Sequence, residues 1–265
     1  MTRNFPAILF GILLLLAAPS HASEKIETIA TRDGVTISFA VTVPEGPPKA
    51  AAILFVGGNG KLKLWQGRGM RSKNFLARSR QYFADGGIYT VTVDVASDQR
   101  REGLIDIRDG RDHRADIAAL VQWARQKTKA PLWLIGTSRG TVSVAHLAPV
   151  LPIDGAVFTA SVTEVSNRRS ANVHDAELQE IKVPSLIVHH KRDECGVTPA
   201  YAVPGFAAKL KNATKVGTLL FDGGDTPISG PCQAQSAHGF LGIEEKVVAD
   251  IVSWMLANGK SALRQ

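Results

Sequence analysis

The sequence predicts an α/β protein with a mainly parallel central sheet flanked by helices. Short runs rich in β-branched residues alternate with segments of helical periodicity along most of the 265 residues. Most of these runs are continuously apolar, as expected of strands buried on both faces. Because no internal repeat or Pro/Gly-rich linker interrupts the pattern, we expect one domain over residues 23–265.

The individual elements follow from turn signals and periodicity. Residues 25–32 and 35–44 are expected to form an antiparallel hairpin around Asp33-Gly34, a dipeptide typical of tight turns. The later strands are expected at residues 50–56, 89–95, 132–135, 155–160, 185–189 and 216–221. Helices are expected at residues 75–84 and 139–148, and apolar residues at helical spacing predict two more around residues 117–124 and 243–254.

The N-terminal segment has the pattern of a secretory signal peptide. Arg3 precedes an apolar run over residues 7–18, and small residues at Ser20 and Ala22 follow it. We therefore predict a signal peptide over residues 1–22 and a periplasmic or secreted protein with no membrane span after cleavage. The alternative is an uncleaved anchor, but the run is shorter than the roughly 20 residues that a bilayer requires.

The two cysteines, Cys195 and Cys232, predict a disulfide because export places them in an oxidising compartment. The alternative is a metal site that includes His189, His190 or His238. No recognised spacing of metal ligands supports it, so no metal is expected.

A candidate nucleophile lies where a strand is expected to meet a helix. Gly136-Thr137-Ser138-Arg139-Gly140 fits the pattern G-x-S-x-G directly after the apolar residues 131–135. A sharp strand-to-helix turn needs small residues on both sides of the serine to keep its hydroxyl exposed. The helix N-terminus that follows also favours developing negative charge.

With this motif in place, the chain resembles the α/β-hydrolase superfamily over nearly all of its mature length. The resemblance implies an α/β-hydrolase fold and a triad in the order serine, acid, histidine, beginning with Ser138. His238 lies in the stretch before the last expected helix, the family's position for the base. The alternative is that His238 is an ordinary surface histidine.

For the acid, the resemblance implies Asp193, which follows the expected strand before it. The carboxylate would hold the imidazole in the correct tautomer and stabilise its charged form. Glu194, Asp222 and Asp225 are nearby competitors, and Glu164 would serve if the acid followed the previous strand.

A glycine-rich loop at residues 56–60 occupies the family's position for an oxyanion hole, without the histidine of the esterase loops. The expected donors are the backbone N–H groups of Asn59 and Arg139. A dinucleotide fingerprint would need a further glycine, and a P-loop would need Ser or Thr after Lys61, where Leu62 stands. No cofactor is therefore expected.

Basic residues without an acidic neighbour cluster between residues 61 and 80, and Arg139, Arg168 and Arg169 add to the positive charge. The cluster is Lys61, Lys63, Arg68, Arg71, Lys73, Arg78 and Arg80. They are either solvated charges or a basic mouth that favours anionic substrates. Nucleic acid is not expected, because no recognised binding motif accompanies the charge. The segment after residue 160 is too short for a large cap domain.

Together these patterns predict a serine hydrolase that cleaves carboxylic esters of small molecules through an acyl-enzyme. A peptidase or an acyltransferase could use the same triad. A non-catalytic binding protein of the cell envelope is the alternative from a different class, although such proteins usually lose a triad residue.

Overall fold

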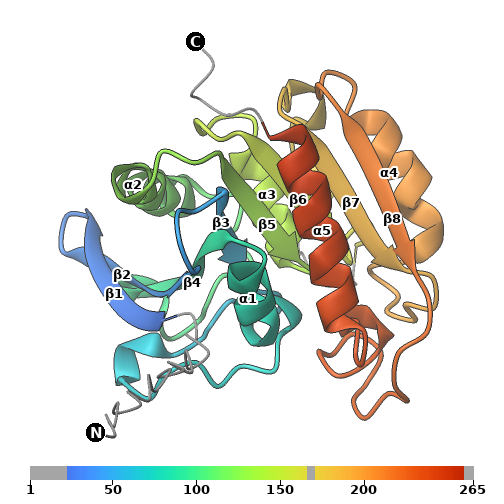
Figure 1. Ribbon diagram of the computed structural model, residues 1–265, viewed down its shortest axis with the longest axis horizontal. Coiled ribbons are helices and arrows are strands. Elements are labelled where there is room, and N and C mark those ends of the chain that lie inside the picture. The colour runs from blue at the N-terminus through green and yellow to red at the C-terminus, as the bar shows by residue number, and fades with distance from the viewer. Residues whose placement is uncertain (1–22, 166–170, 260–265) are drawn as a thin grey trace, which may run out of the picture.

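A computed structural model describes residues 23–165 and 171–259, and its centre is a twisted sheet (Figure 1). Within this part of the chain the sheet has eight strands in the order β1-β2-β4-β3-β5-β6-β7-β8. The strands are β1 Ser23–Arg32, β2 Val35–Val43, β3 Ala50–Phe55, β4 Ile88–Ala96, β5 Leu132–Thr137, β6 Gly155–Thr159, β7 Ser185–His190 and β8 Val216–Phe221. β2 runs antiparallel to β1 and β4, and the other pairs are parallel. The predicted mainly parallel sheet is confirmed.

Helices cover both faces of the sheet (Figure 1). They are α1 Phe75–Asp85, α2 Arg111–Lys127, α3 Gly140–Leu147, α4 Val203–Lys209 and α5 Glu244–Asn258. The buried apolar residues of α1 and α5 form one core with one face of the sheet, and those of α2, α3 and α4 form a second core with the other face. The expected flanking helices are therefore present.

The predicted opening hairpin is confirmed, with Gly34 in the left-handed region at φ 66° between β1 and β2. The other predicted strands are present, with ends that differ from the prediction by at most two residues. β4, for example, begins at Ile88 and ends at Ala96, and all nine of its residues are buried.

Helix α4 is absent from the sequence-based expectations. It has only seven residues and contains Pro204 and Gly205, which are unfavourable in helices except at their first turn. Its buried side chains are Val203 and Phe206, which pack against the sheet. Such a short helix is stabilised by tertiary packing, which a periodicity argument does not detect.

Between β6 and β7, the described residues contain two short 3₁₀ helices, Val173–Asp175 and Leu178–Glu180. The basic residues Arg168 and Arg169 and the predicted signal peptide, residues 1–22, lie outside the described residues. Over residues 23–165 and 171–259, no helix is long and apolar enough to cross a membrane.

Candidate active site

Ser138 occupies the sharp turn between β5 and α3. Its φ is 52°, in the left-handed region that residues other than glycine rarely adopt. The backbone on either side fixes this conformation, because Ser138 N–H donates to Thr159 O at 3.0 Å and Thr141 N–H donates to Ser138 O at 2.9 Å. A non-glycine residue held in this strained region is a common feature of functional sites.

The glycines around Ser138 are required by close backbone contacts. A side chain at Gly136 would collide with the backbone of Gly140, and one at Gly140 would collide with the carbonyl of Phe55. A Cβ at Gly57 would lie 2.9 Å from the Cβ of Ser138. The small residues predicted on both sides of the serine are thus what allows strand β3, the turn and helix α3 to meet.

Asp193 and His238 form a direct hydrogen bond although they are 45 residues apart. His238 Nδ1 donates to Asp193 Oδ2 at 2.9 Å, and the carboxylate is fully buried. Asp193 follows β7, and His238 lies in a 3₁₀ turn, Ala237–Gly239, before α5. Cys195 N–H donates to the other carboxylate oxygen at 3.0 Å. The structure therefore brings together the predicted acid and the predicted base.

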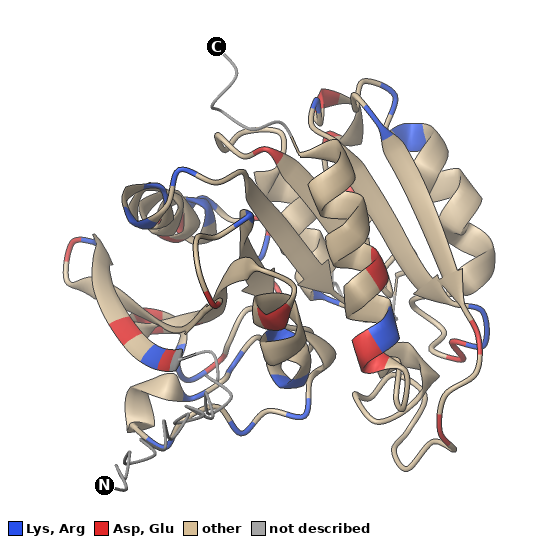
Figure 2. Ribbon diagram, in the orientation of Figure 1, with Lys and Arg blue, Asp and Glu red and all other residues tan. Residues whose placement is uncertain are grey.

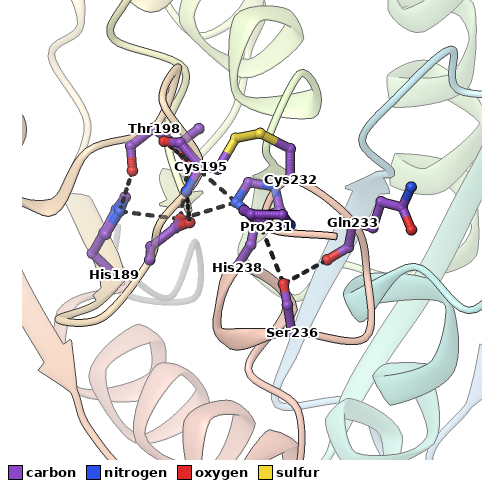
Figure 3. Close-up of a disulfide and its surroundings, with 9 residues drawn as sticks. His189, Cys195, Thr198, Pro231, Cys232, Gln233, Ser236 and His238 are labelled. Atoms are coloured by element: carbon purple, nitrogen blue, oxygen red, sulfur yellow. Dashed lines mark hydrogen bonds and ion pairs between the residues drawn. A yellow bond between two sulfur atoms is a disulfide. The ribbon is translucent and has the colours of Figure 1, made fainter. Parts of the chain in front are cut away.

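Two further residues contact this pair, as Figure 3 shows. The Thr198 hydroxyl donates to Asp193 Oδ2 at 2.9 Å, and its oxygen lies 3.1 Å from His238 Nδ1. His189 Nε2 donates to the Thr198 carbonyl at 2.8 Å and lies 3.4 Å from Asp193 Oδ2. Neither Thr198 nor His189 belongs to the triad predicted from the sequence. The one available signal was the i, i+4 spacing of His189 and Asp193.

These contacts determine the ionisation of Asp193. Burial alone would raise the pKa of the carboxyl group, but the hydrogen bonds from His189 and His238 outweigh burial and hold the pKa of Asp193 well below its usual range. Asp193 is thus ionised at neutral pH, as a residue that orients a histidine must be.

The competing acids have other surroundings. Asp222 is 54% exposed at its side chain and forms an ion pair with Arg192 at 2.8 Å. Glu194 is exposed, and Glu164 is partly buried after β6. Within the described residues, Asp193 is the acidic residue that forms a hydrogen bond with His238.

The predicted disulfide between Cys195 and Cys232 is present, with a Cα–Cα distance of 4.6 Å. It joins the loop that carries Asp193 to the loop that leads to His238 (Figure 3). Within the second loop, the Ser236 hydroxyl shares its hydrogen between the carbonyls of Pro231 and Gln233, at 3.1 Å and 2.9 Å. These contacts stabilise the loop that leads to His238. Cys232 also lines the small cavity beside Ser138.

Removing this disulfide is expected to lower both stability and turnover. Opening a loop of 37 residues corresponds to roughly 3 to 4 kcal/mol of lost stability in the chain-entropy model. Looser orientation of His238 is expected to reduce turnover by up to about a hundredfold. The measurement compares melting temperature and kcat per folded molecule for wild type and Cys195→Ser/Cys232→Ser. A lower melting temperature with unchanged kcat would mean that the bond has only a structural role.

Ser138 and His238 line the same small cavity, of about 40 Å³. Gly57, Gly58 and Asn74 complete one side of it. Such a volume holds little more than a small polar group or a water molecule. A larger pocket of about 370 Å³ shares His238 with it and extends along Ser236 and the loop after β8 to Arg192 and Glu194.

The structure places Asn59, the predicted oxyanion donor, at the edge of the glycine loop. Its carbonyl accepts from Leu104 N–H at 2.9 Å, and it lies against Gly103. Asn59 is not among the residues found to line the 40 Å³ cavity, whereas Gly57 and Gly58 are. Gly60 N–H donates to Gly57 O at 3.2 Å and closes a turn with Gly58 at φ 58°.

Figure 2 shows basic positions in blue on α1 and on the loop that leads to it. Between positions 61 and 80, some basic residues form ion pairs and others are exposed. Arg78 forms an ion pair with Glu244 and donates to Gly239 O, the residue after His238. Arg80 pairs with Glu24. The exposed residues are Lys63, Arg68, Arg71 and Lys73. A basic surface that attracts anionic substrates would therefore contain fewer unpaired charges than the sequence predicts.

The histidines considered for a metal site have other partners. His190 Nε2 donates to Gly223 O at 3.1 Å, and its Nδ1 accepts from Arg192 N–H at 3.0 Å. Over the part of the chain that the structure describes, no group of three His, Cys, Asp or Glu side chains is arranged to hold a metal ion.

Comparison with known proteins establishes the fold. No family model matches the sequence, and no curated protein matches it. The structure is similar to an esterase from Pyrococcus furiosus with a TM-score of 0.63 and 15% identity, over 90% of this chain and 92% of that one. It is also similar to a dienelactone hydrolase from Anabaena variabilis, with a TM-score of 0.60 and 13% identity, over 91% of this chain and 100% of that one.

The structure is also similar to an acylaminoacyl peptidase from Pyrococcus horikoshii, with a TM-score of 0.64 and 15% identity, over 91% of this chain and 42% of that one. At these identities the similarity shows a common α/β-hydrolase fold. The names of the three proteins include an esterase, a lactone hydrolase and a peptidase, so the activity of this chain must be inferred from its site.

Proposed function

We propose that this α/β-hydrolase-fold protein is a serine hydrolase that cleaves carboxylic esters of small molecules with Ser138, His238 and Asp193. The observation that carries the proposal is the arrangement around one 40 Å³ cavity. Ser138 lies on a strained turn at this cavity, and His238, hydrogen-bonded to the buried Asp193, lines the same cavity. This arrangement supports Ser138 as the nucleophile, His238 as the base and Asp193 as the acid that orients the base.

In the proposed reaction, the Ser138 hydroxyl attacks the ester carbonyl while His238 Nε2 accepts its proton. The tetrahedral intermediate collapses when His238 returns the proton to the leaving alcohol, which leaves an acyl-enzyme. A water molecule, deprotonated by His238, then attacks the acyl group and restores Ser138. Asp193 stays ionised throughout and stabilises the imidazolium, in agreement with its lowered pKa.

Two backbone N–H groups are proposed to bind the oxyanion. One is Arg139 N–H, at the N-terminus of α3. The other belongs to the glycine loop, where the lining of the cavity favours Gly58 over Asn59. Each donor of this kind typically contributes about 3 kcal/mol to transition-state stabilisation.

The larger pocket is the proposed site for the rest of the substrate, because His238 is common to both cavities. The small volume beside Ser138 favours esters with a short acyl chain. The exposed basic residues Arg68, Arg71 and Lys73 favour an anionic group on the substrate.

Hydrolysis of nitrophenyl esters tests the proposal. We expect turnover of the acetate to exceed that of the octanoate. An ester with a free carboxylate should be preferred to a neutral isostere at low salt, and the preference should fade as the Debye length falls from about 30 Å toward 3 Å. Absence of any hydrolysis by folded protein would contradict the proposed function. Equal rates for the two esters at every salt concentration would contradict only the anionic preference.

A further inference from the structure

A buried arginine lies behind the glycine loop, on a segment that the proposed mechanism does not use. Arg108 precedes α2 and is 3% exposed. Within the described residues, no carboxylate lies at salt-bridge distance from it. Burying a guanidinium without a counter-charge is costly, so a fold retains one only where its hydrogen bonds or its charge have a use.

The hydrogen bonds of Arg108 go to the glycine loop. Nη2 donates to Val56 O at 3.0 Å and to Gly58 O at 3.2 Å. A Cβ at Gly60 would lie 3.2 Å from the same nitrogen, so the loop packs directly on the guanidinium. One side chain therefore holds two carbonyl groups of a loop that contains three glycines and would otherwise be flexible.

Holding these carbonyls also fixes the N–H groups of the loop. A peptide unit is planar and trans, so its N–H points opposite to its C=O. The Val56 carbonyl shares its peptide with Gly57 N–H, and the Gly58 carbonyl shares its peptide with Asn59 N–H. The peptide between them carries Gly58 N–H, the favoured oxyanion donor, and both of its neighbours are anchored by Arg108.

The other terminal nitrogen of Arg108 contacts a serine of α3, which in turn contacts a histidine of α2. Nη1 donates to Ser143 Oγ at 2.9 Å, and Ser143 Oγ lies 3.0 Å from His113 Nε2. Because the serine oxygen accepts from Arg108, its own hydrogen is available to His113. Burial lowers the pKa of His113 to about 3, so this histidine is neutral and can accept that hydrogen. Ser143 and His113 hold the guanidinium from behind without adding a charge.

Arg108 keeps its positive charge at neutral pH. Burial, and secondarily the charge of Arg139, lower the pKa of Arg108 to about 9. The cation thus lies directly under the loop, where positive charge favours an oxyanion.

We propose that Arg108 is a positioning residue that presents the amides of the glycine loop to the oxyanion formed at Ser138. The inference rests on the proposed function for its catalytic consequence, but its effect on the loop can be measured independently. Arg108 acts through the backbone and does not touch the substrate.

The test compares Arg108→Met and Arg108→Lys with the control Arg125→Met. We expect Arg108→Met to lower kcat about a hundredfold with KM changed less than about twofold, because oxyanion stabilisation acts on the transition state. Arg108→Lys should recover part of this loss, since an ammonium can still donate to the loop. Arg125→Met removes an arginine of α2 that pairs with Asp154 and, within the described residues, forms no hydrogen bond or ion pair with the glycine loop or Arg108. It should lower the melting temperature while kcat stays at the wild-type value.

Hydrogen exchange of a peptide spanning residues 56–60 provides the second readout. It should be faster in Arg108→Met and unchanged in Arg125→Met. A folded Arg108→Met with kcat within about threefold of wild type and unchanged exchange would overturn the inference. If that variant does not fold, wild-type kcat in Arg108→Lys would overturn it. If wild type hydrolyses no ester, the proposed function fails, and the exchange result alone decides whether Arg108 positions the loop.

Discussion

Ser138→Ala is expected to lower ester turnover by at least a factor of about 1,000 while the protein stays folded. The hydroxyl is the proposed nucleophile, and the side chain is partly exposed at a turn that backbone hydrogen bonds hold in place. The measurement is kcat/KM on a nitrophenyl ester together with the free energy of unfolding in urea.

Ser185→Ala is the matched control, because it removes a buried serine hydroxyl at the start of β7, the strand end opposite to the one that Asp193 follows. It should show the reverse result, with lower stability and unchanged kcat. If Ser138→Ala retained more than about a thousandth of the wild-type rate, the nucleophile would lie elsewhere.

Asp193→Asn is expected to lower kcat by about 10⁴ with little change in KM. The amide keeps the shape of the carboxylate, but it does not stabilise the imidazolium and favours the wrong tautomer of His238. Glu164→Gln, at the acid position after the previous strand, is the matched comparison and should retain wild-type kcat. The opposite pattern of the two variants would assign the acid to Glu164.

The same variant tests the lowered pKa of Asp193. A carboxyl group with a native pKa below its unfolded value of about 3.9 stabilises the fold above that pH, and this stability is lost as the pH falls through the native pKa. The difference in unfolding free energy between wild type and Asp193→Asn should therefore be constant near neutral pH and narrow only below about pH 4. A difference that narrowed near pH 6 would exclude Asp193 as its source.

The parts of the fold that could be predicted were those set by local patterns. Buried parallel strands are continuously apolar, and the Asp33-Gly34 turn and the G-x-S-x-G motif depend on a few adjacent residues. Helix α4 could not be predicted, because two apolar side chains, Val203 and Phe206, stabilise it through contacts with the sheet.

In the candidate site, too, residues within local patterns could be predicted, whereas residues that act through distant contacts could not. Ser138, Asp193 and His238 could be proposed from their order along the chain, and the structure joins Asp193 to His238 by a hydrogen bond. Thr198 and Arg108 carried no sequence signal, because their roles depend on contacts with residues 40 and 52 positions away. The choice between Asn59 and Gly58 depends on the turn that the loop adopts, and glycine-rich sequences fit several turns.

Labelling with a fluorophosphonate, followed by mapping of the modified peptide, tests the central claim most directly. The reagent phosphonylates a serine only when a base and an oxyanion hole activate it. We predict a single adduct on Ser138, absent in Ser138→Ala, much slower in Asp193→Asn and unchanged in Ser185→Ala. Folded, disulfide-bonded protein that remained unlabelled, or that carried its adduct on another serine, would contradict the assignment of Ser138, His238 and Asp193 as a catalytic triad.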